Sequence, residues 1–216
     1  MSCRAVIFDL DGTLVDTLAD LGESMNFALT SLGQPTHKVE EYRQMVGDGT
    51  RIFAKRALPE NKEALCEQVM RVMLEHYKDN CFVNSRLYKG INETITELRN
   101  RAIELAVLTN KDQDLAERIV GHFFKAGTFR YVIGAFDGEP VKPGEEGIRR
   151  LIEIMMKLAP SEVIIVGDSG VDMDTAATTG IRAVGVSWGF RSREELIEHK
   201  AAVVIDKPAE LLNLVC

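Results

Sequence analysis

The fold is decided by the stretch Ala5-Val6-Ile7-Phe8-Asp9-Leu10-Asp11-Gly12-Thr13-Leu14, near the start of this 216-residue sequence. Four apolar residues are followed at once by a stretch with two carboxylates and a glycine. An apolar run this short is typical of a strand that is buried on both faces, and Gly12 permits a tight turn soon after it. We therefore predict a buried strand at Ala5–Phe8 whose carboxyl end carries Asp9 and Asp11.

Further apolar runs of the same kind recur along the chain, separated by segments with helical periodicity. Helices between buried strands are typical of parallel crossovers. The predicted architecture is therefore α/β, with a doubly wound, mainly parallel sheet as its core. The further strands are expected at Leu105–Leu108, Tyr131–Ile133, Val163–Val166, Ala183–Val186 and Val203–Ile205. Two of the helical faces are formed by Leu115, Ile119, Val120 and Phe123, and by Ile148, Leu151, Ile152, Met155 and Leu158.

One region of the chain breaks the alternation of strands and helices. From Asp16 to about Ser85 only helical patterns occur, and a stretch of about 70 residues is too long for a simple loop within a compact domain. We predict an inserted helical cap subdomain at 16–85 and an α/β core formed by 1–15 and 86–216. The helical stripes are Leu18, Leu21, Met25, Leu29 and Leu32, ending at Gly33, and Leu65, Val69, Val72, Met73 and His76.

The composition excludes several classes of protein. Asp and Glu number 33 against 26 Lys and Arg, so the formal net charge is −7, which disfavours generic binding to nucleic acid or to a membrane surface. No apolar run approaches the roughly 20 residues of a membrane-spanning helix or forms a signal peptide. The four cysteines are scattered and do not form a zinc motif. We expect a cytoplasmic protein with a small phosphorylated metabolite as its partner, and a homodimer stays open.

Polar side chains follow four segments that the pattern places at strand ends, where functional groups of open parallel sheets gather. Carboxylates that converge there are costly unless a cation lies among them. Because carboxylate oxygens are hard ligands, we expect Mg²⁺ as the cofactor. The groups are Asp9 and Asp11, then Thr109 and Asn110, then Lys142, and finally Asp168 and Asp172. The expected metal site comprises Asp9, Asp11, Asp168 and Asp172.

The same groups suit the chemistry of a phosphate ester. Thr109, Asn110 and Lys142 supply donors and positive charge for a bound phosphoryl group. Asp9 can attack phosphorus as a nucleophile. Asp11 can protonate the leaving alkoxide and later deprotonate the water that cleaves the acyl phosphate. Asp9, Asp11 and Lys142 are therefore the candidate catalytic residues.

Each group also has an interpretation without catalysis. The first motif can form a turn without a metal, and Thr109-Asn110 can cap the following helix. Lys142 can be a solvated surface lysine, and Asp168 and Asp172 can be acids that the helix dipole favours at a helix start. Because all the groups occur together, each at a predicted strand end, we favour a catalytic site.

Together these motifs resemble those of the haloacid dehalogenase superfamily, across essentially the whole chain. The resemblance implies that Asp9 is the nucleophile and a metal ligand. It also implies that Asp11 is the acid/base and offers its backbone carbonyl to Mg²⁺, that Asp168 is a metal ligand with Asp172 as its companion, and that the insertion is a mobile cap. The matching stretches are Phe8-Asp9-Leu10-Asp11-Gly12-Thr13-Leu14, Leu108-Thr109-Asn110, Val141-Lys142-Pro143 and Val166-Gly167-Asp168-Ser169-x-x-Asp172.

Asp11 favours phosphate ester hydrolysis over other reactions of this superfamily, because its dehalogenases and phosphonate-cleaving members differ at that position. The resemblance therefore implies a Mg²⁺-dependent phosphomonoester hydrolase with an aspartyl-phosphate intermediate. Two departures concern the backbone. Gly144-Glu145 follow Lys142-Pro143 where relatives often carry an acid and then a proline, and Tyr88-Lys89-Gly90 replaces the commoner Tyr-Pro-Gly at the exit of the cap.

The stretch Val46-Gly47-Asp48-Gly49-Thr50-Arg51 resembles the cap of phosphoglycolate phosphatases, which implies 2-phosphoglycolate as the substrate. Backbone N–H groups around Gly47 and Gly49, together with Arg51 or Arg56, could bind a substrate carboxylate. The glycines can instead mark a plain turn between helices, and the neighbouring carboxylate opposes an anion. A pyrophosphatase, a nucleotidase, a sugar-phosphate mutase and a non-enzymatic phospho-receiver therefore stay open.

Overall fold

The computed structural model describes residues 3–136, 142–144, 151 and 158–215. Its core is a six-stranded sheet in the order β5-β4-β1-β6-β7-β8, with every neighbouring pair parallel. All six predicted apolar runs form strands of this sheet, so the predicted fold class is confirmed. The strands are β1 (Ala5–Phe8), β4 (Glu104–Asp112), β5 (Tyr131–Ala135), β6 (Val163–Gly167), β7 (Arg182–Val186) and β8 (Val203–Ile205).

Strand β1 lies near the middle of the sheet and is hydrogen-bonded on both sides. Ile7 is in register with Ala106 of β4 and with Ile165 of β6. Successive side chains of a strand point to opposite faces, so Phe8 joins the core on one face while Ile7 joins the core on the other. Both faces are covered, which explains why the run is apolar throughout.

Helices cover both faces of the sheet. Helices α4 and α5 contribute buried residues to the cluster that contains Phe8, whereas α7 and α8 contribute to the cluster that contains Ile7. The predicted helix over 148–158 falls mostly outside the described residues, although Leu151 and Leu158 are described and are buried with α7. The elements are α4 (Ile91–Asn100), α5 (Gln113–Phe123), α7 (Gly170–Thr179), α8 (Arg193–Glu198) and the short helices η3 (Pro160–Glu162) and η4 (Pro208–Asn213).

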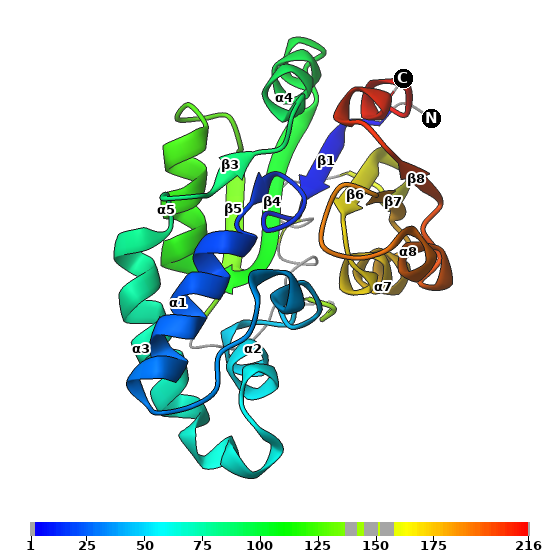
Figure 1. Cartoon of the computed structure of the whole chain (residues 1–216). Helices are drawn as coiled ribbons and strands as arrows, with labels where there is room; N and C mark the ends of the chain where they lie inside the picture. Colours follow the sequence, from blue (N-terminus) through cyan, green and yellow to red (C-terminus); the bar gives the residue numbers. More distant parts are fainter. Residues whose placement is uncertain (1–2, 137–141, 145–150, 152–157, 216) are drawn as a thin grey trace.

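The helical insertion, residues 17–85, enters and leaves the core through two short antiparallel strands, β2 (Val15–Asp16) and β3 (Arg86–Leu87). Figure 1 shows the insertion at the end of the sheet toward which the strand arrows point. That the insertion is a separate subdomain stays a prediction. Its helices are α1 (Leu18–Ser31), η1 (Val39–Gln44), α2 (Thr50–Ala57), η2 (Glu60–Leu65) and α3 (Cys66–Asn80). Among the described residues, no helix combines the length and the apolarity needed to cross a bilayer.

A buried carboxylate ties the two linkers of the insertion together. Asp20, near the start of α1, accepts hydrogen bonds from the backbone N–H groups of Asn84 and Ser85, each at 2.8 Å. The Ser85 hydroxyl donates a further hydrogen bond at 2.7 Å. Both oxygens of the buried carboxylate therefore have partners, which offsets the cost of removing it from water. The start and the return of the insertion are held at a fixed separation.

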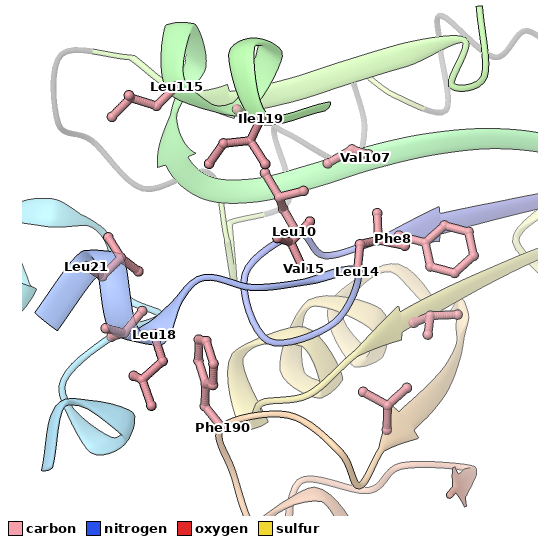
Figure 2. Packing of buried hydrophobic residues seen from close by; sticks show 14 of the residues in the cluster. Phe8, Leu10, Leu14, Val15, Leu18, Leu21, Val107, Leu115, Ile119 and Phe190 are labelled. Carbon is pink, nitrogen blue, oxygen red and sulfur yellow. The ribbon is translucent and has the colours of Figure 1, made fainter. Parts of the chain in front are cut away.

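Apolar side chains anchor the loop that follows β1. Leu10, Leu14 and Val15 are fully buried and pack in one cluster with Leu18 of α1 and Ile119 of α5 (Figure 2). Burial of each large side chain stabilises the fold by about 1.5–3 kcal/mol. Because apolar residues alternate here with the acidic ones, packing of the loop fixes the positions of the carboxylates between them.

Candidate active site

The first carboxylate lies directly at the end of β1. The backbone N–H of Asp9 donates to the carbonyl oxygen of Val166 on β6, 2.9 Å away, so the residue is still held by the sheet. The chain then turns at Gly12, whose φ is +85°, and a Cβ atom there would lie 2.3 Å from Oδ2 of Asp168. Only glycine allows this turn to approach the carboxylate of Asp168 so closely.

Three buried carboxylates meet at this end of the sheet. Asp9 follows β1, Asp168 follows β6 and Asp172 lies in the first turn of α7, and one oxygen atom from each lies within 4.8 Å of the others. Asp168 is held in place by the hydroxyl of Thr13 at 3.2 Å and by the backbone N–H of Phe190 at 2.6 Å. The structure thus brings together three of the four predicted metal ligands.

Lys142 reaches the same cluster from the other side. Its Nζ lies 2.7 Å from Oδ1 of Asp9 and 2.6 Å from Oδ1 of Asp172, and its side chain is buried. The other oxygen of Asp172 accepts hydrogen bonds from the backbone N–H and the hydroxyl of Ser169, at 3.1 and 2.7 Å. Asp172 therefore caps the start of α7, as the interpretation without catalysis expects, and also pairs with the buried lysine.

Charge is unbalanced within the cluster. Burial raises the pKa of Asp9, Lys142 partly offsets this, and Asp172 raises it again. Burial and the carboxylates of Asp9 and Asp172 raise the pKa of Asp168. For Lys142, burial lowers the pKa, but the paired carboxylates outweigh it and the net shift is upward. Three carboxylates with one ammonium leave an excess of negative charge, and a divalent cation that prefers oxygen ligands fits this donor set.

Asp11 does not belong to the three-carboxylate cluster, and its side chain has partners of its own. It accepts a hydrogen bond from the hydroxyl of Thr17 at 2.7 Å, and Nζ of Lys111 lies 3.0 and 3.2 Å from its two oxygens. Lys111 also lies 3.1 Å from the hydroxyl of Tyr77 on α3. A metal contact of Asp11 would have to come from its backbone carbonyl, and this contact stays a prediction.

The side chain of Asn110 forms hydrogen bonds with the backbone of Lys142. Its Oδ1 accepts from the backbone N–H of Lys142 at 2.8 Å, and its Nδ2 donates to the carbonyl oxygens of Lys142 and Gly47, both at 3.0 Å. Thr109 lies beside it, and its hydroxyl accepts from the backbone N–H of Lys111 at 3.2 Å. Direct binding of substrate by Thr109 and Asn110 stays a prediction.

A cavity of about 50 Å³ lies between the strand ends and the insertion. Asp9, Asp11 and Thr109 line it from the core, and Gly47, Gly49 and Tyr77 are among the residues that line it from the insertion. The two glycines are thus placed where the sequence-based hypothesis requires them. Their role in binding substrate stays a prediction.

The two arginines of the predicted substrate clamp lie elsewhere. Arg51 pairs with Glu67, and Arg56 pairs with Asp48 at 2.5 Å and donates to the carbonyl of Met45. Neither arginine lines the cavity. The ion-pair partners of both guanidinium groups lie within the insertion, so the geometry gives no support to Arg51 as a substrate-binding residue, and that role stays a prediction.

The family described as haloacid dehalogenase-like hydrolase matches residues 6–186. The chain belongs to this family. A phosphoglycolate phosphatase of Pseudomonas syringae pv. tomato is 30% identical over 97% of this chain and 78% of its own length. A phosphoglycolate phosphatase of Aquifex aeolicus is 26% identical over 98% of this chain and 96% of its own length. A predicted phosphoglycolate phosphatase from Haemophilus somnus has a solved structure with a TM-score of 0.90, 26% identity and coverage of 100% of this chain and 99% of that one.

These findings confirm the prediction of a haloacid dehalogenase-like phosphatase that resembles phosphoglycolate phosphatases. The geometry adds one residue of this haloacid dehalogenase-like hydrolase that the sequence analysis left without a role. Strand β4 was predicted to end at Leu108, but it continues to Asp112. All four residues from Thr109 to Asp112 line the cavity, so the run of polar residues at this strand end was the signal that could have identified Lys111.

Proposed function

We propose that this chain is a Mg²⁺-dependent phosphomonoester hydrolase that forms an aspartyl-phosphate on Asp9, with 2-phosphoglycolate as the best candidate substrate. The observation that carries this proposal is the arrangement around Asp9. Its buried carboxylate lies beside Lys142 and two further carboxylates, at the open end of a central strand and on the wall of a cavity. Such an arrangement suits a nucleophile that must face phosphorus.

The metal would be held by the oxygens of Asp9, Asp168 and Asp172. When bound, Mg²⁺ would neutralise charge on the transferring phosphoryl group and balance the excess negative charge of these carboxylates. Lys142 lies 2.7 Å from Asp9 and supplies a second positive charge beside the position that the phosphoryl group would take. Asn110 fixes that lysine by holding its backbone N–H and carbonyl.

Asp9 and Asp11 divide the covalent chemistry. An oxygen of Asp9 forms a bond to phosphorus while the bond between phosphorus and the ester oxygen breaks, and Asp11 gives its proton to the departing alkoxide. In the second step Asp11 takes a proton from water, whose oxygen attacks phosphorus and releases phosphate and free Asp9. Thr17 and Lys111 hold the Asp11 carboxylate, which lines the cavity together with Asp9.

The size of the cavity and the names of the relatives support a small substrate. The curated relatives are phosphoglycolate phosphatases. The cavity of about 50 Å³ is far smaller than the roughly 300–1,000 Å³ of sites for drug-sized ligands, which favours a short leaving group over a nucleoside or a hexose. Nucleotidase and sugar-phosphate mutase activities are therefore less well supported than hydrolysis of 2-phosphoglycolate.

A panel of phosphorylated metabolites tests the substrate assignment. With Mg²⁺ present, 2-phosphoglycolate should rank among the best substrates by kcat/KM, ahead of nucleoside monophosphates and hexose phosphates. Hydrolysis of an aryl phosphate with negligible turnover of 2-phosphoglycolate would keep the phosphatase chemistry and overturn the substrate. Absence of turnover of every phosphate ester would overturn the proposed function itself.

A further inference from the structure

We propose that Lys111 is the residue that recognises the carboxylate of the leaving group. The inference rests on the proposed function and goes further by naming the group that selects an anionic leaving group over a neutral one. It replaces the arginine clamp expected from the sequence with a lysine of the core.

The first support is the distribution of positive charge around the cavity. Among the described residues that line it, Lys111 carries the only cationic side chain. The two arginines nearest in sequence to the glycine stretch are bound to acids of the insertion, at Glu67 and Asp48. Lys142 lies deeper, between Asp9 and Asp172, where it serves the phosphoryl end of the substrate.

The second support is the position of the ammonium group relative to the acid/base. Nζ of Lys111 lies 3.0 Å from the nearer oxygen of Asp11, the group that must reach the leaving-group oxygen. In 2-phosphoglycolate the carboxylate is attached to the carbon that bears this oxygen. A cation beside Asp11 is therefore close to the position that the carboxylate of the leaving group would take.

The third support is the way in which the ammonium is held. A lysine ammonium carries three donors, and this one lies within hydrogen-bond distance of both oxygens of Asp11 and of the Tyr77 hydroxyl, so a substrate carboxylate would take the place of one of these acceptors. Its side chain is buried, so an entering carboxylate would lose water and needs a charged partner to replace it. Tyr77 lies on α3, so the insertion and the core build this subsite together.

Two acids, Asp11 and Asp112, line the cavity beside Lys111 and could repel an anionic substrate. Asp11 forms an ion pair with Lys111 and accepts a hydrogen bond from the hydroxyl of Thr17. Asp112 accepts the hydroxyl of Thr50 at 2.7 Å, which fixes it against α2. Both carboxylates are thus held by donors. An entering carboxylate would share the ammonium of Lys111 with Asp11.

The test compares two esters with the same phosphoryl group, 2-phosphoglycolate and 2-hydroxyethyl phosphate, which ends in a neutral hydroxyl. The quantity measured is the ratio of their kcat/KM values, so that effects on the common chemistry cancel. Lys111→Met should lower this ratio about 10- to 100-fold, the loss expected for one charge-assisted contact. Lys125→Met, the same change at an exposed lysine in the loop after α5, should leave the ratio unchanged.

An equal loss on both esters would overturn the proposal, because Lys111 would then only position Asp11. Lys111→Arg keeps the charge and should retain part of the ratio, which guards against a folding defect in the methionine variant. Binding is also measured by calorimetry in the Asp9→Asn background, where no turnover is needed. Adding Lys111→Met should weaken 2-phosphoglycolate selectively; unchanged relative affinities would reject the role. Absence of wild-type turnover would reject the proposed function, and this binding comparison would still decide the role of Lys111.

Discussion

The side-chain amide of Asn110 donates a hydrogen bond to the carbonyl oxygen of Gly47, 3.0 Å away, so the sheet and the helical insertion touch at the cavity itself. The same amide nitrogen donates to the carbonyl of Lys142. A residue at the end of a central strand thereby links the insertion to the lysine beside the nucleophile. Further contacts of this kind join Thr50 to Asp112, and Arg43 to Gly189.

Replacing Asn110 by alanine should impair catalysis more than removing a single contact between the insertion and the core. Asn110→Ala removes the hydrogen bonds to both Gly47 and Lys142, and at about 0.5–1.5 kcal/mol each their loss should lower kcat/KM roughly 10- to 100-fold. Thr50→Val keeps its shape and removes only the contact with Asp112, so the loss should stay within about tenfold. Steady-state kinetics of both variants check the order, and a Thr50→Val defect as large as that of Asn110→Ala would contradict it.

Gly12→Ala should disable the site. A methyl group there would lie 2.3 Å from Oδ2 of Asp168, and the φ of +85° is itself unfavourable for alanine. Because the carboxylate must move, we expect a loss of metal affinity and at least a hundredfold loss of kcat. Gly33→Ala is the matched control, since Gly33 also has a positive φ, of +64°, but has open space around it. Metal titration and kinetics should separate the two variants; similar behaviour would remove Gly12 from the site.

The stability of the protein without metal should fall as the pH rises from about 4 to 8. Burial, with the neighbouring carboxylates, raises the pKa of Asp9 to about 7 and that of Asp168 to about 8. At these two carboxyls the folded state therefore binds more protons than the unfolded state across this range, so the stability that they contribute is fully present at low pH and is lost as the pH rises toward the folded-state pKa values. Added Mg²⁺ should raise the Tm most at pH 8 and least near pH 5. Thermal unfolding with chelator and with Mg²⁺ measures this, and a pH-independent Mg²⁺ effect would contradict it.

Activity should depend on a divalent ion of the right size. Chelation should abolish turnover, Mg²⁺ should restore it, and Ca²⁺ should restore it poorly because it takes more ligands at longer distances. The readout is phosphate release after dialysis against chelator and addition of each ion. Full activity in chelator would show that the buried carboxylates do not serve a metal.

The sheet could be predicted because its central strands are buried on both faces and are therefore apolar throughout. Ala5–Phe8 and Val163–Val166 are uniformly apolar, and both lie in the middle of the sheet. The end of β4 could not be read in this way. Its last residues are polar, yet the strand continues to Asp112 with a register shift against β5 after Leu108.

The same logic predicted where Asp9 and Asp168 lie, since they directly follow β1 and β6, whereas Lys142 comes seven positions after the end of β5. The substrate side of the cavity did not. Whether a charged side chain faces the cavity or pairs with a neighbour depends on packing within the insertion. There Arg51 forms an ion pair with Glu67. The pairing of Lys111 with Tyr77 could not be predicted, because Tyr77 comes from a helix 34 positions away. Local patterns carry no information about such pairs.

The central claim is that Asp9 carries the phosphoryl group, and acid quenching during turnover tests it most directly. The peptide that contains Asp9 should gain the mass of one phosphoryl group, and this adduct should be absent from Asp9→Asn, which should fold normally and lose turnover by several orders of magnitude. Steady turnover without any phosphorylated Asp9 peptide, together with more than a few per cent of wild-type activity in Asp9→Asn, would contradict the account.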